Sequence, residues 1–401
     1  MFSSNPPLGL YIHLPWCEKK CPYCDFNSHE TKSIPEREYV NALLNDLEQD
    51  LPLIWGRSID TIFIGGGTPS LFSGKAIDRL LSGLRALLNF APAIEITMES
   101  NPGSAETDRY RAYFASGVNR LSIGVQSFNN QHLRALGRVH DADQALLAVD
   151  RARQAGFDNI NLDLMYGLPA QSLDQACQDL SQAIELAPAH ISHYQLTIES
   201  NTLFHHHPPE AMPDDDLSWE QQVACQKLLQ ENGYRQYEIS AYCTQGQESK
   251  HNLNYWQFGD YLGIGAGAHG KITLGGENRV LRRIRQRQPR AYLKTAGRDS
   301  IVSETRLDPS DLVFEFMLNA LRLSDGFKTS LFHENTGLSL NDLLPGLQQA
   351  VEQDLIKFDD LKITPTSRGF RYLNDLQAIF LRPLNARNRP FFDSADGIMH
   401  N

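Results

Sequence analysis

The chain has 401 residues, of which 41% are hydrophobic and 21% charged, and this composition is typical of a soluble globular protein. Its net charge of −11 argues against a nucleic-acid-binding protein, which needs a basic face. No run approaches the ~20 apolar residues of a transmembrane segment, and the N-terminus lacks the pattern of a secretory signal. We therefore expect a cytoplasmic protein whose six cysteines stay reduced.

The first predicted strand leads into a loop with three cysteines. Residues 10–14 (LYIHL) are apolar and β-prone, and Cys17, Cys21 and Cys24 follow in the pattern C-x3-C-x2-C. A structural zinc site usually takes four ligands from two separate cysteine pairs, and the other cysteines of this chain are single and scattered. Three thiolates fit a [4Fe-4S] cluster with one open iron. A zinc site and a loop of plain thiols remain as alternatives.

The next 180 residues alternate between predicted strands and helices. We expect parallel strands with right-handed crossovers from this alternation. Six units are too few for a closed eight-stranded barrel, which takes about 250 residues. The predicted strands are 7–14, 60–64, 94–98, 120–125, 159–164 and 191–198, and the predicted helices are 34–50, 75–88, 105–115, 142–154 and 173–186.

Polar residues and glycine fall at the carboxyl ends of these strands: Cys17, Gly66, Glu99, Gln126 and Asp163. In a barrel the carboxyl ends share one rim, where active sites are built. In a doubly wound sheet, which is the rival fold, they would be divided around a switch point. The sequence therefore predicts an α/β fold with a partial (β/α)6 TIM-like barrel.

The pattern changes after residue 200. Residues 201–213 form a His- and Pro-rich segment with His205, His206 and His207, which we expect to be a solvated loop. A helix is predicted at 215–231 and a strand at 234–242. The basic run 279–290 reads as a solvated helix face or as ion-pair partners for the acidic excess, with an anion site as the alternative.

The C-terminal part is predicted to be a separate small domain. A polar, linker-like stretch covers residues 295–304, and two helices and a strand pair follow at 307–323, 338–353 and 355–364. This order suggests an α+β, winged-helix-like module. We expect domains at 1–200, 201–300 and 301–382, and a poorly ordered polar tail at 383–401.

Several motifs occur together and in order. The cysteine pattern after YIHLPWC, then GGGTPS, then E-x-N-P, resembles the radical S-adenosylmethionine (SAM) superfamily. YIHLPWC together with Gln126, Arg138 and Asp163 resembles the oxygen-independent coproporphyrinogen III dehydrogenase group. The resemblance runs from about Leu10 through the C-terminal module and implies a partial (β/α)6 barrel.

The resemblance also implies roles for individual residues. The three cysteines would ligate a [4Fe-4S] cluster whose fourth iron binds SAM, and the other positions would surround the SAM: Tyr11 beside it, Gly66, Gly67 and Thr68 at its methionine end, Glu99 on its ribose hydroxyls, and Gln126, Arg138 and Asp163 completing the pocket. Each position has a structural alternative. Tyr11 would be core, the glycines a turn, Arg138 a surface charge, and the two carboxylates helix caps.

Two features distinguish branches of the group. Porphyrinogen-oxidising members carry a fourth cysteine two residues after the third, and this chain has Phe26 at that position. Those members also carry an N-terminal extension, whereas the first predicted strand of this chain begins close to Met1. The motif H-N-x-x-Y-W, at 251–256, is similar to that of the heme-chaperone branch, of the HemW type. It implies that His251 is an axial heme ligand, and the alternative is a buried histidine packed among aromatic residues.

The resemblance therefore implies a heme chaperone that carries a [4Fe-4S] cluster and SAM and passes heme to heme-dependent enzymes. The alternative is an oxygen-independent coproporphyrinogen III oxidase, a radical SAM decarboxylase; the branch favours little or no such activity. A zinc module without redox chemistry is a third hypothesis. The expected partners are heme and heme-accepting enzymes. A homodimer is compatible with the branch, and the composition of the C-terminal module leaves open a contact with a partner or with the membrane surface.

Overall fold

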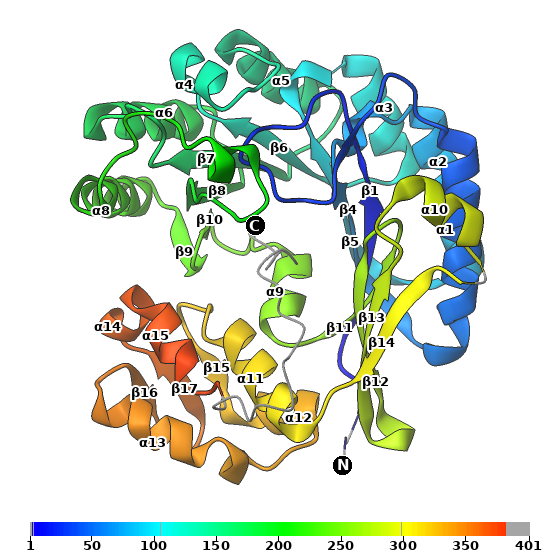
Figure 1. The fold of residues 1–401 in the computed structure, drawn as a ribbon, viewed down its shortest axis with the longest axis vertical. Helices are drawn as coiled ribbons and strands as arrows, with labels where there is room; N and C mark the ends of the chain where they lie inside the picture. Colours follow the sequence, from blue (N-terminus) through cyan, green and yellow to red (C-terminus); the bar gives the residue numbers. More distant parts are fainter. Residues whose placement is uncertain (1, 3, 105, 298, 382–401) are drawn as a thin grey trace.

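A computed structural model of the chain describes residues 2, 4–104, 106–297 and 299–381. Six parallel strands form its centre, adjacent in chain order, and helices cover the outer side of the curved sheet (Figure 1). The strands are β1 (Leu8–Leu14), β4 (Ser58–Gly66), β5 (Asn89–Ser100), β6 (Arg120–Gln126), β7 (Ile160–Tyr166) and β8 (His190–Gln195). The helices between them are α1 (Glu36–Asp50), α2 (Gly74–Leu87), α3 (Thr107–Ser116), α5 (Ala142–Gln154) and α6 (Leu173–Glu185). The predicted partial barrel is confirmed.

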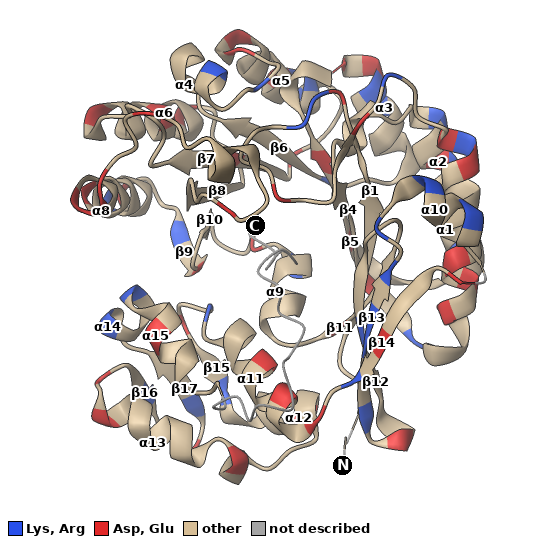
Figure 2. Ribbon diagram, viewed as in Figure 1, with Lys and Arg blue, Asp and Glu red and all other residues tan. Residues whose placement is uncertain are grey.

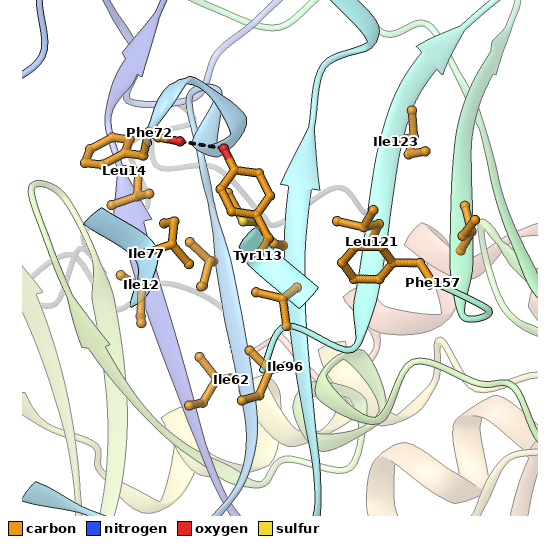
Figure 3. Close-up of a cluster of buried hydrophobic side chains, with 14 of the residues drawn as sticks. Ile12, Leu14, Ile62, Phe72, Ile77, Ile96, Tyr113, Leu121, Ile123 and Phe157 are labelled. Atoms are coloured by element: carbon orange, nitrogen blue, oxygen red, sulfur yellow. Dashed lines mark hydrogen bonds between the residues drawn. The ribbon is translucent and has the colours of Figure 1, made fainter. Parts of the chain in front are cut away.

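The main core lies between the strands and these outer helices. Every second strand residue points outward, so Ile62 and Ile123 pack with Ile77 of α2 and Tyr113 of α3 in one buried cluster (Figure 3). Burying such side chains stabilises the fold by roughly 1.5–3 kcal/mol each. The residues between them on each strand are left to face the inside of the barrel.

The sheet continues on both sides of the six central strands. Four strands follow outward from β1, namely β11 (Asp260–Ile264), β12 (His269–Leu274), β13 (Arg279–Arg285) and β14 (Ile301–Arg306). Two strands extend the other edge, namely β10 (Ala241–Cys243) and β9 (Arg235–Glu238). The prediction of one strand at 234–242 is thus wrong, because the chain turns back after Glu238 and forms a hairpin. The stretch 295–304, expected to be a linker, contains the start of β14.

The basic run forms strand β13 and the start of α10 (Pro289–Thr295), so the predicted helix face is wrong while the predicted ion pairs are confirmed. Figure 2 shows the basic residues along β13. Arg285 is 1% exposed, and its Nε lies 3.0 Å from the buried Asp46 of α1. Arg283 pairs with Asp50 of the same helix at 2.7 Å. The two-residue period of a strand places both arginines against α1, which ties the sheet extension to the barrel.

The C-terminal unit is a small α+β domain, as predicted for a winged-helix-like module. Its sheet has the order β15-β17-β16, and it shares an apolar cluster with helix α9 (Lys250–Trp256). The elements are α11 (Pro309–Ala320), β15 (Phe327–Lys328), α12 (Thr329–Thr336), α13 (Leu344–Glu352), β16 (Ile356–Phe358), β17 (Lys362–Pro365), α14 (Ser367–Arg371) and α15 (Leu373–Ala378). The tail 383–401 lies outside the described residues.

The remaining elements are short apart from α8, which has the predicted bounds. They are β2 (Trp16–Cys17), β3 (His29–Glu30), α4 (Asn130–Ala135), α7 (Leu203–His206) and α8 (Asp215–Glu231), with 3-10 helices η1 (Leu51–Leu53), η2 (Pro69–Leu71), η3 (Pro102–Ser104), η4 (Gly275–Glu277) and η5 (Leu340–Asp342). A loop was predicted where α7 lies, and Thr202 caps this single turn through the backbone N–H of His205. Among the described helices, none has the length and apolar character to span a bilayer.

Candidate cluster and cofactor site

Solvent reaches the inside of the barrel at one level of the strands. Tyr11 is the single partly exposed residue of β1, and Gly124 and Asp163 are the single ones of β6 and β7. Glu99 and Tyr194 are likewise partly exposed after buried runs of β5 and β8. Chain neighbours of Tyr11, Glu99, Gly124 and Asp163 belong to the outer core cluster, so these four residues face inward. Tyr194 lies on the same face of β8 as Ser192, which pairs with Asp163, so it faces inward as well. Together they outline an accessible space near the carboxyl ends of the strands, which we call the barrel mouth.

Glu99 and Asp163 are the two carboxylates of this space. Glu99 Oε2 accepts a hydrogen bond from the backbone N–H of Gly66 at 3.0 Å, and burial and the charge of Asp163 raise the pKa of Glu99 to about 8. Asp163 accepts hydrogen bonds from Ser122 Oγ at 2.9 Å and Asn161 Nδ2 at 2.7 Å. Burial also raises the pKa of Asp163.

The helix-cap alternative for these two carboxylates does not match the structure. Helix α3 is preceded by Glu106 at its N-cap, and α6 is capped by Ser172. Glu99 retains acceptor capacity beyond its bond to Gly66, and a carboxylate with free lone pairs suits a ligand that offers hydroxyl groups. The fit of Glu99 to a ribose is therefore good.

A partly buried arginine and a strained glutamine lie next to the carboxylates. Arg138 donates from Nη2 to the carbonyl of Gly124 at 2.9 Å and from Nη1 to the thiol of Cys21 at 3.5 Å, and its buried Nε has no partner in the described part of the chain. Gln126 has a φ of +69°, which is rare outside glycine, and accepts a hydrogen bond from the Tyr194 hydroxyl at 2.8 Å. Since the guanidinium has unused donor capacity, it suits an anionic ligand.

The glycine motif holds the cysteine loop against the barrel. Gly67 N–H donates to the carbonyl of Leu14 at 2.9 Å, and Thr68 donates from its backbone to the carbonyl of Trp16 at 2.8 Å and from its hydroxyl to Cys17 Sγ at 3.5 Å. A Cβ on Gly67 would lie 2.5 Å from the carbonyl oxygen of Trp16. A Cβ on Gly66, whose φ is +118°, would lie 2.6 Å from the ring of His13. Both glycines are needed for this close packing.

The three loop cysteines lie close enough to influence one another. Burial raises the pKa of Cys17 and raises that of Cys24 to about 11, and the other two thiols add to the shift of Cys24. Among the described residues, no three His, Cys, Asp or Glu side chains are close enough to share one metal ion. A zinc ion needs its sulfur ligands at about 2.3 Å from a common centre, whereas in a cubane each thiolate binds a different iron. The donor set fits a cluster better than a single zinc ion.

His251 lies away from the barrel mouth and is fully buried. Its Nδ1 is 2.8 Å from the Thr61 hydroxyl, and its Nε2 is 3.0 Å from the Tyr255 hydroxyl. Burial lowers the pKa of His251 to about 3. The ring of Phe63 separates it from the mouth, because Phe63 stacks with His251 at 5.3 Å and with Tyr11 at 6.3 Å. The structure thus brings together the predicted residues of the mouth, and His251 is not among them.

Sequence reasoning missed several residues of the mouth. Tyr194 and Gly124 face the accessible space, and Ser122 orients Asp163. His13 bonds to the Tyr11 hydroxyl and to the carbonyl of Asn27, both at 2.9 Å, and so positions the strand against the loop. The place of Tyr194 near the end of strand six was a usable signal, whereas nothing in the sequence marked Ser122.

Comparisons with known proteins agree with this arrangement. The family model for the radical SAM superfamily matches residues 11–183, and the model for the HemN C-terminal domain matches residues 307–372. "Heme chaperone HemW" of Escherichia coli is 49% identical to the chain, over 94% of this chain and 98% of that protein. The chain belongs to the HemW family. A further HemW, from Bacillus subtilis, is 33% identical over 94% of this chain and 100% of its own length.

The fold is also that of a solved structure. Coproporphyrinogen III oxidase (HemN) from E. coli, described as a radical SAM enzyme, superposes with a TM-score of 0.79, covering 94% of this chain and 90% of that chain at 24% identity. HemW membership confirms the resemblance inferred from the motifs. The roles of individual residues in binding cluster, SAM and heme stay predictions.

Proposed function

We propose that the chain is a heme chaperone, a cytoplasmic protein that binds heme and passes it to heme-dependent enzymes. The observation that carries the proposal is the near full-length similarity to proteins named heme chaperones, at up to 49% identity. The replacement of a fourth cysteine by Phe26, which is 38% exposed, supports the same branch.

The barrel mouth would hold a [4Fe-4S] cluster and SAM. The cluster ligands would be Cys17, Cys21 and Cys24, and the residues around the SAM would be Tyr11, Gly66, Gly67, Thr68, Glu99, Gln126, Arg138 and Asp163. When bound, the cluster supplies an electron to the sulfonium of SAM. In this assignment Glu99 accepts hydrogen bonds from the ribose hydroxyls, and the Nε of Arg138, which has no partner among the described residues, supports binding of a carboxylate.

Heme ligation by His251 remains a prediction with a structural condition attached. Both ring nitrogens already have hydrogen-bond partners, and the residue is 1% exposed. An iron–nitrogen bond at Nε2 would require the Tyr255 hydroxyl to leave and the helix α9 to separate from the residues around it. Heme-accepting enzymes, a homodimer and a peripheral membrane contact complete the proposed set of partners.

The test separates binding from turnover in the same preparation. The full chain is reconstituted with iron and sulfide without oxygen, and ferric heme and coproporphyrinogen III are added to separate samples. We expect stoichiometric heme binding, transfer of that heme to an apo-heme protein, and no protoporphyrinogen IX. Formation of protoporphyrinogen IX at many equivalents per chain, without heme binding, would overturn the proposal in favour of the oxidase.

A further inference from the structure

A series of buried hydrogen bonds leads from the barrel mouth into the interior of the barrel. It begins at Asp163, whose Oδ1 accepts a hydrogen bond from Asn161 Nδ2 at 2.7 Å. The side-chain oxygen of Asn161 lies 2.6 Å from His190 Nδ1, and His190 Nε2 lies 2.9 Å from the hydroxyl of Tyr237. The Tyr237 hydroxyl also accepts a hydrogen bond from the backbone N–H of Ser249 at 3.3 Å. We call these five residues the His190 network.

The His190 network joins three strands and ends at a helix. Asn161 of β7 pairs with His190 of β8, and Tyr237 belongs to β9 at the edge of the same sheet (Figure 1). Ser249 is the N-cap residue of α9. The side chains of Asn161, His190 and Tyr237 are all buried. Because a buried polar group without a partner is costly, each member depends on the next for its hydrogen bond.

The two ends of the His190 network fix the direction of its hydrogen bonds. A backbone N–H can only donate, so the Tyr237 hydroxyl accepts from Ser249 and gives its own proton to His190 Nε2. At the other end an ionised carboxylate can only accept, so Asn161 turns its NH2 group to Asp163 and its oxygen to His190. The imidazole of His190 therefore carries its proton on Nδ1 and donates it to Asn161.

The surroundings of His190 agree with this assignment. Burial and the charge of Arg120 lower the pKa of His190 well below its usual value, so the ring is neutral at pH 7. Ser192 Oγ also donates to the side-chain oxygen of Asn161, at 3.1 Å, and occupies its second acceptor position. The second amide proton of Asn161 goes to Ser122 Oγ at 2.7 Å. The amide of Asn161 therefore has a partner on every side and a single orientation.

This amide determines how Asp163 is held at the mouth. The two oxygens of the carboxylate accept hydrogen bonds from Asn161 Nδ2 and from Ser122 Oγ. Both donors lie one level deeper in the barrel, because Asn161 comes two residues before Asp163 on β7 and pairs with Ser122 of β6. The remaining acceptor capacity of the carboxylate is thereby directed to the mouth, where a ligand can use it.

We propose that His190 is a positioning residue for the SAM site: it holds the amide of Asn161, and through this amide it orients the carboxylate of Asp163. His190 is 1% exposed and lies beneath the mouth, so it acts on a ligand only through other side chains. Hydrogen bonds aligned in one direction strengthen one another, so the loss of His190 also weakens the bond at Asp163. The inference rests on the proposed function, because that proposal assigns Asp163 to the residues around the SAM.

The experiment measures the SAM affinity of the cluster-loaded full chain by calorimetric titration and its stability by urea unfolding. H190L removes both hydrogen bonds of the ring. H190N places a short amide near the position of Nδ1, so it can donate to Asn161 but does not reach Tyr237. We expect H190L to weaken SAM binding by about tenfold, equal to about 1.4 kcal/mol. H190N should bind SAM within about threefold of the wild type, since the bond to Asn161 is kept.

Two further variants separate positioning from stability. Y237F keeps the aromatic ring and removes the hydroxyl that donates to His190, so SAM affinity should fall a few-fold. Y234F is the matched control, because its hydroxyl is outside the His190 network and donates to the carbonyl of Pro188 at 2.7 Å. Y234F should lose similar stability and keep its SAM affinity. If H190L does not fold, SAM affinity in Y237F equal to that in Y234F would overturn the inference.

A double-mutant cycle tests the route through Asp163. In a D163A background, H190L should weaken SAM binding no further, because the carboxylate that His190 orients is gone. The same loss in that background as in the wild type, or equal losses of SAM affinity in H190L and H190N, would make His190 a purely structural residue. Wild-type SAM affinity in H190L would overturn the inference alone. A wild-type chain that binds no SAM would overturn the proposed cofactor site and this inference, while heme binding and transfer test the chaperone function separately.

Discussion

The barrel mouth and helix α9 both carry residues that the sequence assigned to ligands, and their local chemistry is opposite. At the mouth, Glu99 keeps free acceptor capacity, Arg138 has a buried Nε without a partner among the residues described, and Gln126 holds a φ of +69°. On α9, both nitrogens of His251 are bonded and its ring is stacked on Phe63. The mouth has unused polar capacity, whereas the histidine of α9 has none.

This difference distinguishes residues that are available to bind a ligand from residues that stabilise the fold. A buried polar group without a partner costs about 1–3 kcal/mol, so such groups persist where a ligand completes them. His251, by contrast, joins strand β4 to the cluster shared with the C-terminal domain, through its bonds to Thr61 and Tyr255. Trp256 is the exception on α9, because its Nε1 has no hydrogen-bond partner in the part of the chain that the structure describes; its ring instead packs under Arg322 at 4.2 Å.

The largest expected effect is at the cysteine loop. We expect C21S to reduce the iron content of the reconstituted protein from about four atoms per chain to near zero, because two thiolates do not hold a cubane that needs three. The control is C177S, which removes a partly buried thiol of α6 away from the loop. Iron content is measured by colorimetric assay after anaerobic desalting. Full retention of iron by C21S would exclude the three-cysteine ligand set.

The second effect tests the structural role assigned to His251. We expect H251A to lower the free energy of unfolding by about 2–4 kcal/mol, because the buried hydroxyls of Thr61 and Tyr255 lose their partner and a cavity is left. Urea unfolding of the iron-free chain measures it. H206A, an exposed histidine, should change stability by less than about 0.5 kcal/mol. A stable H251A variant that loses heme would instead make His251 the ligand and reverse the comparison.

The elements that were predicted correctly follow from local patterns. Helices α5 and α8 have the predicted bounds, because an apolar period, an acidic N-cap and a clear end lie within one segment. The motif residues at the strand ends converge because parallel strands in a barrel place their carboxyl ends on one rim. The convergence of these polar residues at the mouth could therefore be predicted from the sequence.

The rest depended on contacts between distant segments. The basic run became β13 because Arg283 and Arg285 meet Asp46 and Asp50 of α1, more than two hundred residues earlier in the chain. The burial of His251 depends on Thr61, from a different part of the chain. Neither the acidic residues of α1 nor Thr61 can be identified as partners from the residues next to the basic run or next to His251. The sequence therefore left open whether the basic run forms a helix face or ion pairs, and whether His251 is a heme ligand or a buried histidine.

The third effect concerns the variant E99Q, which we expect to weaken SAM binding and to raise the stability of the SAM-free protein. The folded chain keeps Glu99 protonated up to a pKa of about 8, whereas the unfolded chain loses this proton near 4.5. The free energy of unfolding of the wild type therefore falls as the pH rises between these values. We expect E99Q to weaken SAM binding by at least about tenfold and to stabilise the SAM-free protein by roughly 1 kcal/mol at pH 8, a modest value because solvent reaches this carboxyl.

Two controls make the E99Q result specific. E106Q removes a carboxylate at the N-cap of α3 that makes no side-chain cap bond, so it should change neither SAM affinity nor the pH profile. At pH 5, E99Q and the wild type should have nearly equal stability, because Glu99 is then protonated in the folded chain. Calorimetric titration with SAM and urea unfolding at pH 5 and pH 8 measure the two quantities. Unchanged SAM affinity in E99Q would remove Glu99 from the site.

The smallest expected effect is at Tyr194, the mouth residue that the sequence analysis missed. Y194F removes the hydroxyl that donates to Gln126 Oε1 at 2.8 Å, so we expect SAM affinity to fall a few-fold and stability to fall by about 1 kcal/mol. Y234F is the matched control, because it removes a hydroxyl that donates to the carbonyl of Pro188 at 2.7 Å. Pro188 precedes the amino end of β8, whereas the mouth lies at the carboxyl ends of the strands. Y234F should lose similar stability and keep its SAM affinity. Equal SAM affinities in Y194F and Y234F would show that the hydroxyl of Tyr194 serves the fold alone and does not contribute to SAM binding.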